Sequence, residues 1–337
     1  MTIYDIARQC GVSTTTVSRV ISNSAPVSSA VRDKVLAAME NANYVPQPRR
    51  RKNQTQKIQA QGSGLIGVFL PEFGHSYFDR VVRELHEQLI CREKSLMLLP
   101  VDERSKDLWM RQLHSLPLEG VVLLQENTPE SLIGLLQERK IPLVMCGALS
   151  LNKSFSSVHV DDIAASYDGI KFLLRLGHRK IGLISDSPRD ISSGFQRLTG
   201  SGKALSDGGV SCPDDWKVCN GCTYQNGYEA ARHLLSLHPE ITALFAFSDV
   251  AAFGAMAAAR DMGRRLPEEL SVLGFDDIIT EYDGLPKLTC VHQPMEQIVS
   301  KSLELLDQAA SGDGEPVSSV ILPHTIIERD SCRHPAL

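Results

Sequence analysis

The sequence predicts an α/β protein in which a small helical domain precedes a larger, two-lobed domain built on doubly wound parallel sheets. A length of 337 residues is too great for one ordinary domain and leaves room for two or three hydrophobic cores. The formal charge of −5 is unevenly spread, because the first 60 residues hold nine Lys or Arg against three Asp or Glu. From residue 64 onward, short apolar runs alternate with helical segments. A basic helical module is therefore expected in front of an acidic α/β body.

Three short helices are expected in residues 1–47. Apolar residues recur at helical spacing from Ile3 to Cys10, and Gly11 can adopt the left-handed conformation that ends a helix. Ser13 is a suitable N-cap for a second helix that begins at Thr14. A third helix is expected from about residue 28 to residue 42, with one apolar face formed by Val31, Val35, Ala38, Met39 and Ala42.

The second helix has an apolar side and a hydroxyl-rich side. Val17, Val20 and Ile21 are expected to pack against the other helices. The opposite side carries short polar side chains and one cation: Thr14, Thr15, Ser18 and Arg19. Short side chains let a helix enter the major groove closely, where Thr can contact a thymine methyl and Arg can donate two hydrogen bonds to guanine. The alternative is that these residues only cap and cover a solvent-exposed helix, but the basic surroundings favour a contact with nucleic acid.

Residues 48–63 are expected to form a basic linker. The stretch from Pro46 to Gly64 reads PQPRRRKNQTQKIQAQGSG, with four successive cations followed by a Gln-rich run that has no apolar face. Repulsion among neighbouring cations disfavours an isolated helix here.

The remaining residues predict parallel sheets covered by helices on both faces. The expected strands are short apolar runs without polar alternation: LIGVFL, SLMLLP, GVVLL, IPLVM, KIGLIS, ALFAF and SVLGF. Helical segments lie between them, including residues 77–92, 162–176, 224–236 and 249–262. This β/α alternation over some 270 residues is typical of doubly wound sheets, and the length is sufficient for two of them.

Ligands bind such sheets beyond the carboxyl ends of the strands, and polar or aromatic residues follow several of the predicted strands. They are Phe73, His75, Tyr77 and Phe78 after the first strand, a polar loop that reaches Arg197, and the pairs Ser248-Asp249 and Asp276-Asp277. Carboxylates, one guanidinium and aromatic rings suit a polyhydroxylated or nitrogenous small molecule. Considered singly, Asp249 and Asp277 are expected to be helix N-caps, and Phe78 fits a core position equally well.

The first 47 residues resemble the DNA-binding headpiece of the LacI/GalR family of bacterial transcription regulators. The resemblance lies in TIYDIARQCGVSTTTVSRVI and VSSAVRDKVLAAMENANYVPQP, where several fixed spacings agree together. It implies a three-helix, lambda-repressor-like helix-turn-helix domain that reads half of a near-palindromic double-stranded operator as a dimer. The resemblance assigns base reading to Thr14, Thr15 and Arg19, and phosphate contacts to Tyr4, Ser13, Thr16, Ser18 and Ser28.

The linker departs from the family pattern. The family usually inserts an apolar side chain of a short hinge helix into the minor groove, and the corresponding position falls near Asn53, with no Leu, Met or Phe between Pro46 and Gly64. We therefore expect Arg49, Arg50 and Arg51 to lie along phosphates or in a narrow minor groove, with less kinking of the DNA.

The body resembles the family's effector-binding and dimerisation domain, which is similar to type I periplasmic binding proteins. The resemblance lies in motifs such as RLGHRKIGLIS, RLTGSGKAL, SDVAAFGAMAA and LPEELSVLGFDD. It implies a domain over residues 64–337, with lobe 1 at about 64–160 and 292–321 and lobe 2 at about 161–291 and 322–334. It places effector contacts at Arg197, Cys222, Ser248 and Asp276 of one lobe, with Phe73, Tyr77 and Phe78 on the other.

The function expected from this resemblance is a repressor of carbohydrate utilisation, controlled by a sugar or sugar phosphate and acting as a homodimer or tetramer. A nucleoside or purine effector is the alternative, followed by a thiol or metal sensor formed by Cys219 and Cys222, whose C-N-G-C spacing also suits an ordinary turn. Catalytic and cofactor motifs are absent from the sequence, so we expect no enzyme, no metal and no cofactor. The chain also lacks an apolar run of membrane-spanning length and a signal segment, so we expect a cytoplasmic, nucleoid-associated protein.

Overall fold

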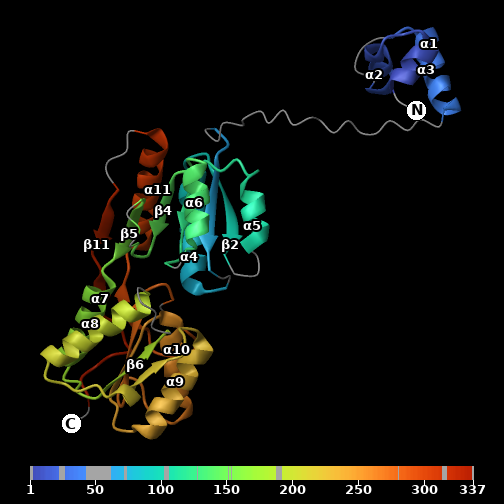
Figure 1. Ribbon diagram of the computed structural model, residues 1–337. Helices are drawn as coiled ribbons and strands as arrows, with labels where there is room; N and C mark the ends of the chain where they lie inside the picture. Colours follow the sequence, from blue (N-terminus) through green and yellow to red (C-terminus); the bar gives the residue numbers. More distant parts are fainter. Residues whose placement is uncertain are drawn as a thin grey trace. The chain divides into compact units, whose positions relative to one another are not determined.

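The structure is a computed structural model that describes residues 3–22, 27–42, 62–71, 74–101, 106–126, 128–150, 152, 154–186, 192–279, 281–312 and 317–335. The chain divides into two compact units, Met1–Ile58 and Gln59–Leu337. Figure 1 shows the helices of the first unit and the two sheets of the second.

The N-terminal unit contains three helices around one small core. They are α1 (Ile3–Cys10), α2 (Thr14–Ser22) and α3 (Ser29–Asn41). Between α1 and α2, Gly11 has a φ of 65°, and the Ser13 hydroxyl accepts a hydrogen bond from the Thr16 amide over 3.1 Å. The predicted turn and N-cap are thus confirmed. The core is formed by Ile6, Ala7, Cys10, Val17, Val20, Val35 and Ala38.

The larger unit has two lobes, each built on a six-stranded sheet. In lobe 1 the strands run in the order β11-β5-β4-β3-β1-β2, and all of their pairs are parallel. These strands are β1 (Leu65–Leu70), β2 (Ser95–Pro100), β3 (Gly120–Leu123), β4 (Leu143–Cys146), β5 (Ser156–Val160) and β11 (Ser319–Leu322). The helices of this lobe are α4 (Ser76–Ile90), α5 (Lys106–Leu113), α6 (Glu130–Glu138) and α11 (Met295–Ser311).

Lobe 2 repeats this plan with the strand order β12-β10-β9-β8-β6-β7, in which only the edge pair β10–β12 is antiparallel among the described pairs. The strands are β6 (Ile181–Ser185), β7 (Lys217–Cys219), β8 (Ala243–Ala246), β9 (Ser271–Asp276), β10 (Thr289–His292) and β12 (Thr325–Ile327). The helices are α7 (Asp162–Arg175), α8 (Ser193–Asp207), α9 (Tyr224–Leu237), α10 (Asp249–Asp261) and the short 3-10 helix η1 (Asp214–Trp216). The predicted fold class is confirmed.

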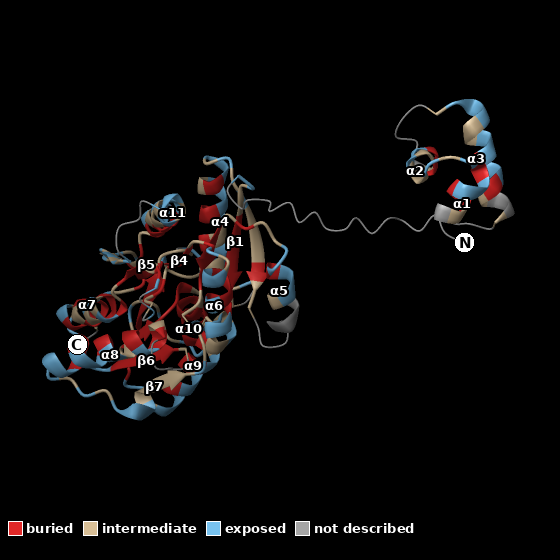
Figure 2. Cartoon of the chain, turned by 45° about the horizontal axis from the view of Figure 1, so that its top comes forward, coloured by how far each residue is buried: buried red, intermediate tan, exposed pale blue. Residues whose placement is uncertain are grey.

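Each sheet is covered on both faces, which explains why its strands are apolar without polar alternation. In β1, Ile66 and Val68 face a core shared with α4 and α11, whereas Phe69 faces the core beneath α5 and α6. In β8, Leu244 faces α9 and α10, and Phe245 faces α7 and α8. Figure 2 shows central strands such as β1, β4 and β6 as buried and the outer faces of the helices as exposed.

The chain passes between the lobes three times. β5 of lobe 1 leads directly into α7 of lobe 2, β10 of lobe 2 leads into α11 of lobe 1, and β11 leads into β12. Three short connections of this kind are a hinge about which two lobes can close on a ligand.

Close contact between α7 and α8 requires a glycine. A Cβ at Gly200 would overlap the carbonyl oxygen of Ile163 and the hydroxyl of Ser166 on α7, whereas a Cβ at Gly202 of the same helix meets nothing within 4 Å. Gly200 therefore fixes the distance between the two helices that cover one face of the lobe 2 sheet.

Gly200→Ala is expected to lower the free energy of unfolding by about 1–3 kcal/mol, because the added methyl group must push α8 away from α7. Gly202→Ala is the matched control and is expected to raise stability by about 0.5–1 kcal/mol through its better helix propensity. Urea unfolding followed by tryptophan fluorescence measures both. Equal stability of the two variants would contradict this packing argument.

Candidate functional site

Helix α2 carries five of the eleven residues predicted to contact DNA. Thr15, Arg19 and Ser13 are exposed, and Thr14 and Ser18 are half-buried. Val17 and Val20 on the opposite side are buried. Ser28 is exposed just before α3, and the Thr16 hydroxyl lies 2.9 Å from the Ser13 hydroxyl. A helix with this division can present short hydroxyls and one guanidinium to a groove while its apolar side remains in the core.

Several predicted residues lie outside the described part of the chain. The backbone of Tyr4 belongs to α1, but its side chain is outside the described set. Arg49, Arg50, Arg51 and Phe73 lie there entirely. Their predicted roles remain predictions.

A cavity of about 710 Å³ lies between the two lobes. Its lining comes from the segments that follow β1, β3 and β4 in lobe 1 and β6, β7 and β8 in lobe 2, together with Asp276 at the end of β9. These strands surround the points where the strand order reverses in each sheet, β1–β3 and β6–β8, which is the usual binding position in open α/β sheets. The volume fits a small molecule of the size that such clefts bind.

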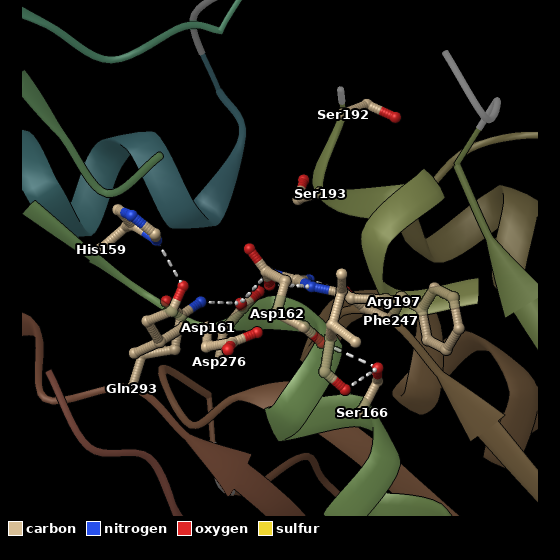
Figure 3. A network of polar contacts seen from close by, with 12 residues as sticks. His159, Asp161, Asp162, Ser166, Ser192, Ser193, Arg197, Phe247, Asp276 and Gln293 are labelled. Carbon is tan, nitrogen blue, oxygen red and sulfur yellow. Dashed lines mark hydrogen bonds and ion pairs between the residues drawn. The ribbon is translucent and has the colours of Figure 1, made fainter. Parts of the chain in front are cut away.

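Arg197 of lobe 2 lines the cavity, and Figure 3 shows it within a polar network that includes Asp162 and Asp276. Its Nε donates to Asp162 Oδ1 over 2.7 Å, one terminal nitrogen donates to the Phe247 carbonyl over 2.6 Å, and the other lies 3.7 Å from Asp276 Oδ1. The guanidinium carbon lies 3.6 Å from the centre of the Phe275 ring. The two carboxylates raise the pKa of Arg197 despite its burial, so the group stays charged.

Asp276 is held from a second direction by Gln293, whose amide donates to Asp276 Oδ1 over 2.7 Å. Burial raises the pKa of Asp276, and Arg197 opposes this rise. Asp276 and Asp277 both have positive φ angles, 100° and 62°, which is rare for residues other than glycine. Strained backbone of this kind persists where the surrounding contacts impose it, often at binding sites.

Lobe 1 supplies an aromatic wall. The Tyr77 hydroxyl donates to the Gly147 carbonyl over 3.2 Å, and the Tyr77 and Phe78 rings meet edge to face at 5.5 Å. Burial raises the pKa of Tyr77 well above its ordinary value, so its hydroxyl remains protonated. Both rings line the cavity, and Phe78 also packs against the lobe 1 core.

Ser248 and Cys222 also line the cavity, but the Ser248 hydroxyl and the Cys222 carbonyl already form hydrogen bonds within the protein. The Ser248 hydroxyl caps α10 by accepting from the Ala251 amide over 3.1 Å, and it donates to the Cys222 carbonyl over 2.8 Å. Burial raises the pKa of the Cys222 thiol to about 12. The structure therefore brings Tyr77, Phe78, Arg197, Cys222, Ser248 and Asp276 together around one cavity.

Three local expectations were wrong. Arg197 lies within helix α8, not in a polar loop; the helix forms despite three glycines because α7 packs against it. Ser248, not Asp249, is the N-cap of α10. Asp249 instead accepts from the Ile278 and Ile279 amides and from the Cys290 thiol. Asp277 caps no helix and binds Arg329 and His292.

Sequence reasoning missed Glu126, which connects the two lobes. It follows β3 in lobe 1, and its Oε1 accepts a hydrogen bond from the Ser193 amide, at the start of α8 in lobe 2, over 2.9 Å. Burial raises the pKa of Glu126 to about 7, against the lowering effect of that hydrogen bond. Its position two residues after the apolar run GVVLL was the available signal.

The described residues give no support for a metal or thiol sensor. They contain no group of three or more His, Cys, Asp and Glu side chains that could hold a metal ion. Cys219 and Cys222 are free, burial raises the pKa of both thiols, and Gly221 between them has a φ of 117°, as in a turn.

Comparisons with known proteins agree with this architecture. Residues 2–47 match the model of bacterial regulatory proteins of the lacI family, and residues 170–332 match that of the periplasmic binding protein-like domain. The transcriptional regulator MalR of Clostridium butyricum is 30% identical over 340 residues, which cover 98% of this chain and 99% of MalR. Catabolite control protein A of Priestia megaterium is 28% identical over 336 residues, or 99% of each chain. The solved complex of the regulator CelR with cellobiose is similar with a TM-score of 0.72 and 27% identity, over 98% of this chain and 100% of that chain.

A helix-turn-helix unit joined to a two-lobed binding domain defines a DNA-binding transcriptional regulator. The chain belongs to the lacI family of bacterial regulatory proteins. Among its described residues, no helix is long and apolar enough to cross a bilayer.

The stability of the larger unit is expected to fall as the pH rises from about 4.5 to 7. The folded state holds the Glu126 proton up to a pKa of about 7, whereas the unfolded chain releases it near 4.5, so the folded state binds more protons in this window. The pKa of Asp249 is raised to about 8, so this group also lowers the free energy of unfolding as the pH rises. Glu126→Gln is expected to reduce the pH dependence of the free energy of unfolding in part.

Urea unfolding at several pH values measures this effect through tryptophan fluorescence. The control is Glu138→Gln, which removes an exposed carboxylate of the same lobe. If Glu126→Gln keeps the pH dependence of the unmodified protein, Glu126 does not carry the raised pKa.

Proposed function

We propose that the chain is a homodimeric transcriptional repressor whose operator affinity is set by a small polyhydroxylated effector bound between the two lobes. The observation that carries the proposal is the combination of the exposed face of α2 with the cavity around Arg197, both in one chain. No catalytic step is assigned to any residue, and the proposed site of action is the cytoplasm, at the DNA.

The proposed DNA contact places α2 of each protomer in a major groove. Thr14, Thr15 and Arg19 read base edges, and the hydroxyls of Ser13, Thr16, Ser18 and Ser28, with Tyr4, contact phosphates. The basic linker of residues 48–63, with Arg49, Arg50 and Arg51, adds sequence-independent attraction to the backbone. Dimerisation presents two such helices to a near-palindromic operator.

The proposed effector lies against Arg197 and Asp276 in lobe 2 and against Tyr77 and Phe78 in lobe 1. Arg197 retains donors for ligand oxygens, Asp276 can accept from hydroxyls, and an aromatic ring can cover an apolar sugar face. The solved cellobiose complex of CelR and the name of MalR favour a carbohydrate. Closure on the ligand changes the relation of the lobes, and the resulting change in operator affinity equals the ligand's differential affinity for the two conformations.

Arg19→Ala is expected to weaken binding to the preferred operator by about 10- to 100-fold and to relax the preference for one base pair, because a guanidinium fork on a base is lost. The operator is first selected from fragmented genomic DNA with the full chain, and affinities are then measured by fluorescence anisotropy at fixed salt. Lys34→Ala, which removes an exposed cation of α3, is the control and is expected to leave the sequence preference unchanged. An unchanged preference in Arg19→Ala would contradict the assignment.

Arg197→Ala is expected to abolish saturable binding of carbohydrates, and Arg197→Lys to weaken it strongly, because a single ammonium cannot replace the fork. Trp109 and Trp216 provide a fluorescence signal for titration with neutral mono- and disaccharides. Circular dichroism establishes whether each variant is folded. A folded Arg197→Lys variant that binds as tightly as the unmodified protein would contradict the assigned site.

A further inference from the structure

The cavity between the lobes is strongly acidic. Glu126, Asp186 and Asp276 line it, and Asp162 lies beneath it in contact with Arg197. Among the described lining residues, Arg197 is the one permanent cation. Three acidic side chains thus line the cavity and a fourth lies beneath it, against one guanidinium.

The positive charge of Arg197 is already neutralised within the protein. It has two carboxylate partners, Asp162 and Asp276, and a carbonyl partner at Phe247. A ligand oxygen can still receive a hydrogen bond from it, but an anionic ligand gains little, since it meets the two carboxylates at the same time. Arg197 in this setting suits a hydroxyl better than a phosphate.

The other natural position for an anion, the N-terminus of α8, is also occupied. Helix N-termini attract phosphates through their free amides and dipole. Here the Ser193 amide donates to Glu126 of lobe 1, and Asp186 lies directly against Gly194, where a Cβ would overlap its carboxylate. The chain fills this position with its own carboxylates.

Within the part of the chain that the structure describes, neither Glu126 nor Asp186 forms an ion pair. Burial is the largest cause of the raised pKa of Glu126, and repulsion from Asp162 and Asp186 adds to it, while the Ser193 hydrogen bond and Arg197 lower this pKa only in part. A positive group placed in the cavity beside Glu126 and Asp186 would relieve this repulsion and gain two charge-assisted hydrogen bonds.

We infer that the effector carries a protonated amino group and no phosphate or carboxylate, so that an amino sugar is the ligand class that the cavity selects. The inference rests on the proposed effector site and narrows the sugar or sugar phosphate expected from the sequence. Hydroxyls of the ligand face Arg197 and Asp276, and its ammonium lies beside Glu126 and Asp186.

The test is isothermal titration of the full-length protein at pH 6.5 and constant ionic strength with D-glucosamine, D-glucose and D-glucose 6-phosphate. Glucosamine is expected to bind about tenfold more tightly than glucose, and the phosphate to bind at least about tenfold more weakly than glucose. Glu126→Gln and Asp186→Asn are expected to bring the ratio of glucosamine to glucose affinity toward one. Glu138→Gln, which changes the same charge outside the cavity, should retain the ratio.

Equal affinity for glucosamine and glucose, tighter binding of the phosphate, or an absence of binding by all three would overturn the inference. If glucose binds in an Arg197-dependent manner without a preference for the amine, the inference fails and the proposed function stands. If the full chain also retains no genomic DNA fragment selectively, the proposed function fails as well.

Discussion

The cavity depends on one buried cation. Arg197 is 8% exposed. Its side chain is held by Asp162 at the start of α7, by the Phe247 carbonyl just after β8 and by Asp276 at the end of β9. It therefore joins the two helices and two of the strands that meet at the base of the cavity. A guanidinium at this depth is tolerated only because its partners offset the loss of water, and removal of one partner leaves an uncompensated buried charge. Contacts within the protein therefore hold the cation on the ligand-facing surface of lobe 2.

The opposite wall is attached differently. Lobe 1 contacts the start of α8 through Glu126, and three short connections link the lobes. The pKa of Glu126 lies near neutrality, and its side chain reaches from lobe 1 to lobe 2. A charged ligand beside it can therefore change its protonation state and, with it, the contact between the lobes. A ligand that binds both walls then shifts the balance between open and closed forms only by its differential affinity for them. The ligand's differential affinity for the two forms also limits how far it can change operator affinity.

Much of the fold could be predicted from the sequence because its signals are local. Runs such as LIGVFL and KIGLIS lack polar alternation since α-helices cover both faces of their sheets, and the Gly11–Ser13 turn carries its own conformational and capping signals. The predictions were wrong where a residue's structure depends on contacts with residues far away in the sequence. Helix α8 forms despite three glycines because Gly200 lets it lie against α7. Asp249 is not the expected N-cap because its carboxylate accepts hydrogen bonds from backbone amides 29 and 30 residues away. Glu126 was missed because its partner belongs to the other lobe.

In the proposed function, the exposed face of α2 and the cavity around Arg197 belong to one coupled system. The most direct test measures the effector's affinity twice, once for the free protein and once for the protein bound to its operator, together with the operator's affinity with and without effector. The effector's affinity changes by some factor when the operator binds, and the operator's affinity changes by some factor when the effector binds. The two factors are expected to be equal and to differ from one, as linkage requires for coupled sites. A factor of one in both measurements would contradict this coupling.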